Sequence, residues 1–118
     1  MEQTVLSKGI PGETCSIEVA IDIIGSKWTF YIIRDLLIDG TMRFGDLLKS
    51  LEGISPKTLS VRLRELEEQH IIQRTVYPEV PPRVEYCLTE KGKLLEPIFI
   101  ELKKFGMLIC EENKKKKD

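Results

Sequence analysis

Apolar side chains recur every three or four positions along the first part of this chain, which is the spacing of one face of an α-helix. The repeats predict four consecutive helices, over residues 16–24, 26–39, 44–51 and 55–69. Serines that can act as N-caps stand at the start of three of them, at Ser16, Ser26 and Ser55. Pro56 follows the last of these serines, at the first helical position, where its fixed φ and missing N–H do no harm. The fourth helix therefore has the best-defined start.

Two strands are predicted next, over residues 71–77 and 83–88, because the second segment alternates apolar with polar side chains. The connection from Pro78 to Pro82 holds three prolines, which stiffen a projecting turn. A last helix is expected from a cap at Thr89, kinked or restarted near Pro97. Its apolar positions repeat at intervals of three and four: Leu95, Ile98, Leu102, Phe105 and Ile109.

Two short helices joined by a tight turn at Gly53, followed by a hairpin, are the layout of a winged helix-turn-helix. The expected fold class is α+β and mainly helical, with N- and C-terminal dimerisation helices around this unit. We expect one domain over 15–112, a flexible arm over 1–14 and a lysine-rich disordered tail over 113–118. The tail is expected to serve solubility or to strengthen nonspecific DNA binding.

The last helix carries a second apolar set, Leu94, Phe99 and Leu108. A helix that is apolar on two sides must be covered on two sides, and a second copy of the chain can supply the cover. A homodimer would place two equivalent helices about 34–36 Å apart, one turn of DNA, on a roughly palindromic site.

Charge is distributed unevenly along the segment 55–69. Its first half holds basic residues and no acid, whereas Glu65, Glu67 and Glu68 make the second half acidic. The helix dipole favours the opposite order, so helix stability does not explain the arrangement. Contact with DNA phosphates and guanine edges explains it, although a solvated helix face is the alternative interpretation.

The candidate DNA contacts follow from this face and from its flanks. In the helix, the side chains opposite or beside the leucine stripe are Ser55, Lys57, Thr58, Ser60, Val61, Arg62 and Arg64. Arg64 can reach a base, and Val61 can touch a thymine methyl group. Arg43 before the third helix and Arg83 beside the proline-rich tip can contact the flanking backbone or a minor groove.

The overall charge limits how DNA can be bound. The 118 residues carry 18 basic and 19 acidic side chains, and residues 1–113 carry a net charge of −4. DNA binding therefore needs a local patch. The longest apolar run, Phe30 to Ile33, is far shorter than the roughly 20 residues of a membrane-spanning helix, and the N-terminus lacks the pattern of an export signal. A cytoplasmic protein without membrane contact is expected.

Reactive side chains are few. One histidine, His70, and the widely spaced Cys15, Cys87 and Cys110 do not form a disulfide framework, zinc site, catalytic triad or phosphate loop. We expect no metal, no cofactor and no enzymatic activity. The main alternative to DNA binding is a winged helix that serves as a protein-interaction module, which the acidic body outside the patch would suit.

Several motifs together resemble the HxlR-type winged helix regulators of bacteria and archaea. They are Cys15, Gly25-Ser26-Lys27-Trp28, Arg43-Phe44-Gly45-Asp46-Leu47, Gly53-Ile54-Ser55-Pro56-Lys57-Thr58-Leu59, Leu63-Arg64-Glu65-Leu66-Glu67, Tyr77-Pro78-Glu79-Val80-Pro81-Pro82-Arg83-Val84-Glu85-Tyr86 and Leu88-Thr89. The resemblance covers about residues 15–109. The family often has Gly-Gly-Lys-Trp or Gly-Lys-Trp where this chain has Gly25-Ser26-Lys27-Trp28, and Trp-Gly where it has Phe105-Gly106. Both departures leave the DNA-binding interpretation intact.

The resemblance implies a homodimeric DNA-binding transcription factor, related in shape to MarR-type regulators and expected to act as a repressor. It implies that the helix 55–69 lies in the major groove and that the hairpin, with its tip over 77–83, is the wing. Some relatives use the cysteine at the position of Cys15 to sense oxidants or electrophiles. Cys15 is therefore the candidate sensor, because a thiolate near a helix N-terminus is stabilised, while a buried inert cysteine is the alternative. The sequence identifies no small-molecule effector.

Overall fold

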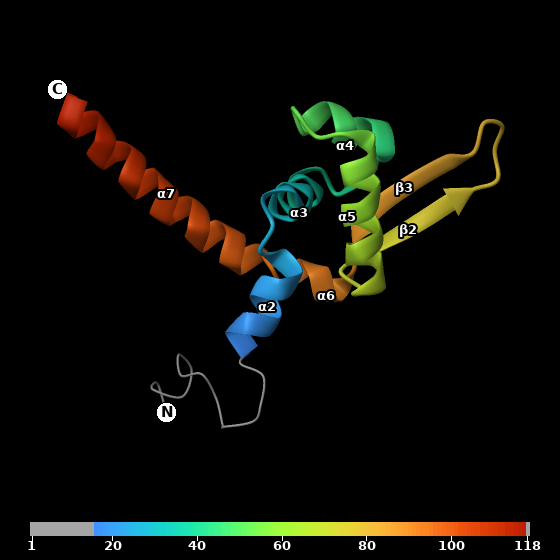
Figure 1. Ribbon diagram of the computed structural model, residues 1–118, viewed down its shortest axis with the longest axis horizontal. Coiled ribbons are helices and arrows are strands. Elements are labelled where there is room, and N and C mark those ends of the chain that lie inside the picture. The colour runs from blue at the N-terminus through green and yellow to red at the C-terminus, as the bar shows by residue number, and fades with distance from the viewer. Residues whose placement is uncertain (1–15, 118) are drawn as a thin grey trace.

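The computed structural model describes residues 16–117, so the arm expected over 1–14 and the candidate sensor Cys15 lie outside the described residues. The elements in chain order are α2 (Ser16–Ile24), α3 (Lys27–Asp39), β1 (Thr41–Arg43), α4 (Phe44–Ser50), α5 (Pro56–Glu68), β2 (Ile72–Tyr77), β3 (Arg83–Leu88), α6 (Glu90–Lys93) and α7 (Glu96–Lys117). Figure 1 shows α7 and the β2–β3 hairpin projecting to opposite sides of a helical centre. The winged helix-turn-helix layout and the mainly helical α+β class are confirmed.

The start and end signals of the central helices act as the sequence predicts. The Ser26 hydroxyl accepts a hydrogen bond from the backbone N–H of Thr29 at 3.2 Å and so caps α3. Gly40 follows α3 with φ of 83°, a left-handed conformation that glycine adopts without a steric penalty. Ser16 is the first residue of α2, one position inside the cap expected for it.

The sheet has three antiparallel strands in the order β1-β3-β2. The pairing of β2 with β3 runs from Ile72 opposite Leu88 to Tyr77 opposite Arg83. Strand β1 was not predicted; it has only three residues and pairs Met42 with Tyr86 of β3. So short a strand carries no readable alternation, and it exists through pairing with residues more than forty positions later.

The restart expected near Pro97 is found in the C-terminal helices, whereas the end of the last helix differs from expectation. The break falls at residues 94–95, between α6 and α7, and Pro97 occupies the first turn of α7. A proline is tolerated there because the first N–H groups of a helix have no intrahelical partner. In addition, α7 continues to Lys117, whereas a disordered tail was expected over 113–118. Lysine favours helix, and cations near a helix C-terminus interact well with its dipole.

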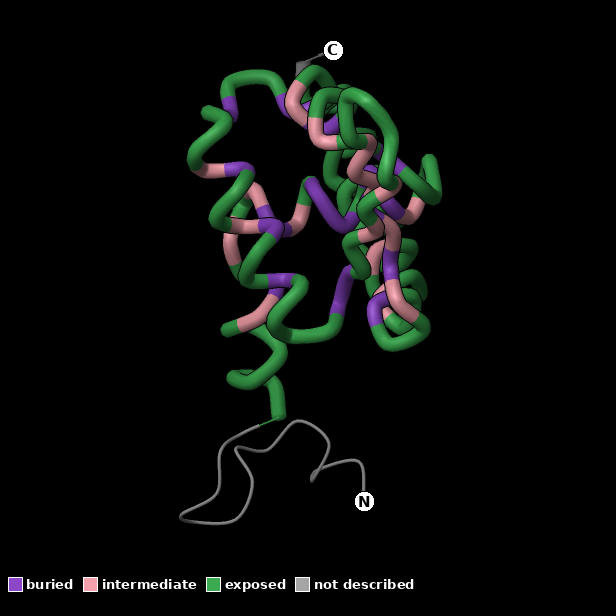
Figure 2. Tube along the Cα trace, turned by 90° about the vertical axis from the view of Figure 1, so that its right-hand side faces the viewer, coloured by how far each residue is buried: buried purple, intermediate pink, exposed green. Residues whose placement is uncertain are grey.

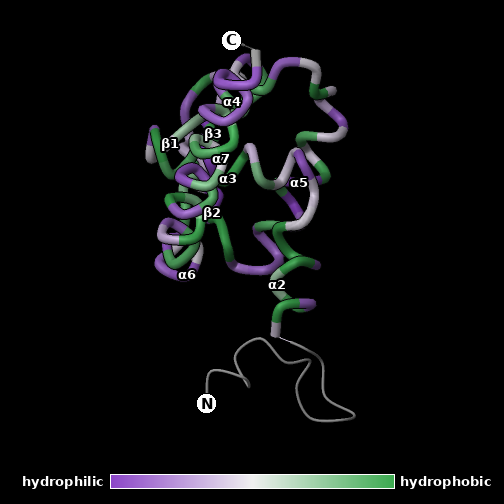
Figure 3. The backbone as a smooth tube through the Cα atoms, turned by 90° about the vertical axis from the view of Figure 1, so that its left-hand side faces the viewer, coloured by the Kyte–Doolittle hydropathy of each residue, from purple (hydrophilic) through white to green (hydrophobic). Residues whose placement is uncertain are grey.

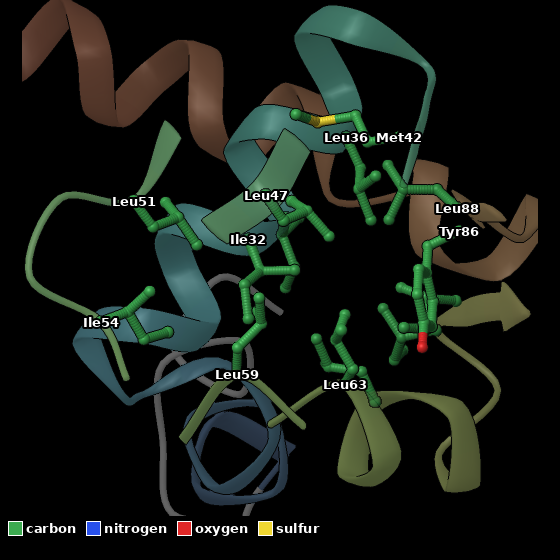
Figure 4. Packing of buried hydrophobic residues seen from close by; sticks show 14 of the residues in the cluster. Ile32, Leu36, Met42, Leu47, Leu51, Ile54, Leu59, Leu63, Tyr86 and Leu88 are labelled. Atoms are coloured by element: carbon green, nitrogen blue, oxygen red, sulfur yellow. The ribbon is translucent and has the colours of Figure 1, made fainter. Parts of the chain in front are cut away.

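A single apolar cluster holds α5 against α3, α4 and the sheet. Leu59, Leu63 and Leu66 of α5 are buried, as the leucine stripe predicts. Leu59 and Leu63 point toward Ile32 of α3 and Tyr86 of β3 (Figure 4). Figure 2 shows the buried positions on faces that turn toward neighbouring elements, while the outward turns are exposed. The cluster therefore fixes the orientation of α5 and leaves its opposite face in solvent.

Two helices contribute little to this cluster. Beyond Phe99, every residue of α7 up to Lys116 is exposed, including Leu102, Phe105 and Leu108. Helix α2 stands at the edge of the molecule with hydrophobic turns, and Ile17, Val19 and Ile21 are exposed (Figure 3). No helix within residues 16–117 is both long and apolar enough to cross a membrane.

Candidate nucleic-acid interface

Helix α5 is the second helix of the helix-turn-helix, and its start is well defined. The turn before it contains Gly53, whose φ of 94° requires the left-handed region. The Ser55 hydroxyl accepts a hydrogen bond from the backbone N–H of Thr58 at 3.1 Å and donates one to the Thr58 hydroxyl at 2.9 Å. Thr58 is half-buried. The cap thus uses the hydroxyl groups of Ser55 and Thr58 together with the Thr58 backbone N–H.

The outward face of α5 carries cations without partners. Lys57, Ser60 and Arg64 are exposed, and Val61 is 37% exposed beside them. Within the described part of the chain, neither Lys57 nor Arg64 forms an ion pair, while Arg34, Arg62, Arg83, Lys93 and Lys104 do. Lys57 and Arg64 are thus available for a ligand on this face.

Arg62 does not share that face. Its Nη1 lies 2.9 Å from Oε1 of Glu65, and its side chain is only partly exposed. It lines a polar recess of about 240 Å³ between α2 and α5, together with Asp22 and Glu68. The structure therefore sets Arg62 apart from the other candidate contacts of α5. The pair is spaced i,i+3 within α5, so it could have been expected from the helical spacing, whereas the recess beside α2 could not.

The two flanking arginines lie on the sheet. The register pairs Arg43 with Glu85, and Glu85 with Thr75, so these residues share the face of the sheet opposite the core. Arg43 is exposed, and its backbone N–H donates to Oδ2 of Asp46 at 3.0 Å at the start of α4.

Arg83 is held by its neighbours at the base of the hairpin tip. Its guanidinium stacks over the ring of Tyr77 at 4.0 Å and forms ion pairs with Glu79 at 3.4 Å and Glu85 at 3.5 Å. The wing arginine is thus neutralised by two carboxylates. Val80, at the tip itself, is fully exposed.

One further cation lies beside α5 and is not among the predicted contacts. Arg74 of β2 is exposed and pairs with Tyr86, so it lies on the core side of the sheet, next to α5. A signal existed in the sequence, because Arg74 falls between Ile72 and Val76 in the apolar phase of its strand. A charged residue on the core-facing side of a strand is expected at the edge of the core, where its charge stays in contact with water.

The two described cysteines lie away from α5. Cys87 is half-buried on β3 and Cys110 is exposed on α7, and both are free thiols. Cys15 lies outside the described residues.

Comparison with known proteins agrees with this geometry. Residues 23–114 match the family model described as HxlR-like helix-turn-helix. An uncharacterised HTH-type transcriptional regulator of Synechocystis is 46% identical over 95 residues, covering 80% of this chain and 70% of that protein.

Two solved structures share the fold. The redox regulator HypR in its reduced form aligns with a TM-score of 0.77 at 38% identity, over 84% of this chain and 97% of the HypR chain. A MarR-family regulator from Enterococcus faecalis aligns with a TM-score of 0.75 at 33% identity, over 92% of this chain and 99% of that chain. The chain belongs to the HxlR-like helix-turn-helix family.

Proposed function

We propose that this protein is a cytoplasmic transcription regulator that binds duplex DNA in a sequence-specific way and represses transcription by occupying its operator. The observation that carries the proposal is the unpaired, exposed pair of cations on the outward face of α5, Lys57 and Arg64. In a winged helix-turn-helix this helix enters the major groove. Arginine reads guanine there, and lysine neutralises backbone phosphates.

The charge order of α5 supports this function over simple solvation. Arg62 and Glu65 neutralise each other at 2.9 Å, so the free positive charge of the helix is concentrated at Lys57 and Arg64. Lys57 lies in the first turn of α5, where a cation is unfavourable by about 0.3–1 kcal/mol. Bound phosphate would remove that cost.

We propose that the regulator acts as a homodimer formed through its terminal helices. The exposed apolar residues of α7 and α2 support the proposal, because a monomer rarely leaves so much apolar surface in water. An apolar groove of about 490 Å³ between α3 and α7, with Phe30, Leu37 and Phe99 in its wall, continues this surface. A second copy of the chain has the matching apolar surface in α7, as a two-fold interface requires.

We also propose that Cys15 makes DNA binding responsive to oxidants or electrophiles. The support comes from the relatives, because HypR, which is 38% identical to this chain, is a redox regulator. Cys15 immediately precedes α2 in the sequence, and α2 belongs to the proposed dimer surface. Oxidation there would act on the dimer rather than on α5 directly.

The DNA-binding proposal is tested with an operator selected from a random pool of duplexes. We expect Arg64→Ala to weaken operator binding roughly 5- to 150-fold and to relax specificity at one base position. Lys57→Ala should weaken binding evenly across sequences. It should also lower the slope of log affinity against log salt by about one, because one phosphate contact is lost. Fluorescence anisotropy over a salt series measures both effects.

Lys93→Ala is the matched control, because it removes one exposed, ion-paired lysine from α6. It should leave operator affinity unchanged. If the wild-type protein selects no duplex even at low salt, the proposed function is wrong and the protein-interaction module is favoured.

The sensor proposal is tested by measuring operator affinity with and without diamide. Wild type is expected to change its affinity, and Cys15→Ser should not respond. Cys110→Ser serves as the control, because Cys110 is an exposed thiol on α7. An equal response of wild type and Cys15→Ser would contradict the assignment of the sensor to Cys15.

A further inference from the structure

A recess of about 350 Å³ opens between α5 and the hairpin. Its polar lining comes from both elements: Ser60, Arg64 and Glu67 of α5, Arg74 of β2 and Tyr86 of β3. The buried side chain of Tyr86 lies beside Leu63, with its hydroxyl at the edge of the apolar cluster (Figure 4). The apolar core thus ends at a surface notch that carries two guanidinium groups.

Arg74 reaches this notch because of the register of the sheet. Ile72 opposite Leu88, Arg74 opposite Tyr86 and Val76 opposite Val84 all project from one face. Ile72 and Leu88, the first of these pairs, are buried. Arg74 is exposed because it lies where α5 no longer covers the sheet completely.

The charges in the recess do not balance. Arg64 and Arg74 line it together with a single carboxylate, Glu67, and the described residues include no ion pair for either arginine. Two guanidinium groups on neighbouring walls, with hydroxyl groups of Ser60 and Tyr86 in the same lining, form a donor set suited to an anion with several oxygens.

We propose that this recess binds one backbone phosphate of DNA with Arg74 as the phosphate ligand from the hairpin, while Arg64 on α5 remains the residue that reads a base. The inference rests on the proposed DNA-binding function. A base edge is the less suitable occupant, because bases are reached from the outer ridge of the helix, whereas the phosphates that border the groove lie at its sides. The contact would fix the position of α5 on the duplex and would be independent of sequence.

The test uses two probes, the selected operator and a 30-base-pair duplex of mixed sequence without it. We expect Arg74→Ala to weaken binding to both duplexes by the same factor and to lower the slope of log affinity against log salt by about one. Arg74→Lys should keep the slope, since it keeps the charge. Gln73→Ala is the control, because Gln73 is an exposed neighbour on the opposite face of β2.

A second variant separates phosphate binding from a structural role for Arg74. Glu67→Gln removes the carboxylate from the recess and should strengthen binding to both duplexes. If Arg74 only balances Glu67, Glu67→Gln will not strengthen binding, and the proposal is overturned. Urea denaturation of Arg74→Ala should match wild type, since Arg74 is exposed.

The outcomes distinguish the inference from the function on which it rests. If Lys57→Ala and Arg64→Ala weaken binding while Arg74→Ala changes neither affinity nor salt slope, the phosphate site is wrong and the DNA-binding function stands. If Arg74→Ala affects the operator alone, Arg74 contacts a base, and the phosphate assignment is also wrong. Failure of the wild-type protein to bind either duplex would overturn both.

Discussion

Two glycines of this fold have opposite surroundings. A β-carbon on Gly92 of α6 would overlap the carbonyl oxygen of Ile71 and would meet the Leu88 side chain at 3.0 Å. A β-carbon on Gly45 of α4 would meet nothing within 4 Å. The close approach at Gly92 lets the backbone that leaves the hairpin pack directly against the segment that enters it. Thr89 reinforces this junction, because its hydroxyl donates to the carbonyl oxygen of His70 at 2.6 Å.

Gly92→Ala is therefore expected to destabilise the protein, by roughly 1–3 kcal/mol as an overpacking substitution. Gly45→Ala is the matched control and should be neutral or stabilising by up to about 1 kcal/mol, because alanine favours helix over glycine. Urea denaturation followed by circular dichroism measures both changes. Equal midpoints for the two variants would contradict the close packing at Gly92.

Single residues also set the limits of what could be predicted about the site. The helical period correctly placed Lys57 and Arg64 on the outward face of α5. The same period relates Arg62 to Glu65, three residues later, but it could not show that Arg83 is held by Tyr77 and two carboxylates. The contacts of Arg83 depend on the geometry of the hairpin, which pairs Tyr77 of β2 with Arg83 of β3 and brings Glu79 of the tip close to it.

At the scale of elements, the N-terminus of α5 has two roles: its cap stabilises the helix, and the same end is proposed to face DNA. The Ser55 hydroxyl caps the helix at 3.1 Å from the Thr58 N–H, in the same turn that carries Lys57. An N-cap contributes typically about 1 kcal/mol to stability. The same end of the helix favours anions through its dipole, so the cap lies in the region proposed to face phosphate.

Ser55→Asp separates the two roles. Aspartate caps helices as well as serine does, so this variant should unfold at nearly the wild-type urea concentration. Its carboxylate should nevertheless repel phosphate and weaken binding to any duplex. Ser55→Ala, by contrast, should lose about 1 kcal/mol of stability. If Ser55→Asp binds DNA as wild type does, the start of α5 does not face the duplex.

The elements were predicted to different extents, for physical reasons. Helices with strong caps and a wide apolar stripe, α3 and α5, appear with nearly the expected bounds. Strand β1 was missed because its three residues are a strand only through pairing with β3. The end of α7 was missed because lysine runs are compatible with both a solvated tail and a helix, and local composition does not decide between them.

At the scale of the whole molecule, α7 is the least covered part. Its 22 residues extend from the helical centre, and Phe105 is 63% exposed within one chain (Figure 1). The hairpin projects to the other side. A second copy that covers α7 would therefore leave α5 and the hairpin of each subunit open to DNA.

Phe105→Asp tests this arrangement. The wild-type protein should sediment as a dimer at micromolar concentration, with a melting temperature that rises with protein concentration. The variant should sediment as a monomer and lose operator affinity, because only one half-site is then engaged. Lys104→Ala, which removes the neighbouring exposed side chain, should remain dimeric. A monomeric wild type would contradict the proposed assembly.

The contact between Phe30 and Phe99, whose rings are tilted by 36° with centroids 4.6 Å apart, has a geometric consequence for such a dimer. Residues 100–116 of α7 are exposed, so the two rings lie where α7 leaves the core of the domain. A change in the direction of α7 would therefore pivot about this contact. A tilt of a few degrees at the two rings displaces the C-terminal end of α7 by several times the movement at the rings. Replacing Phe30 with a smaller side chain should thus change the preferred number of base pairs between half-sites while leaving the preferred bases the same.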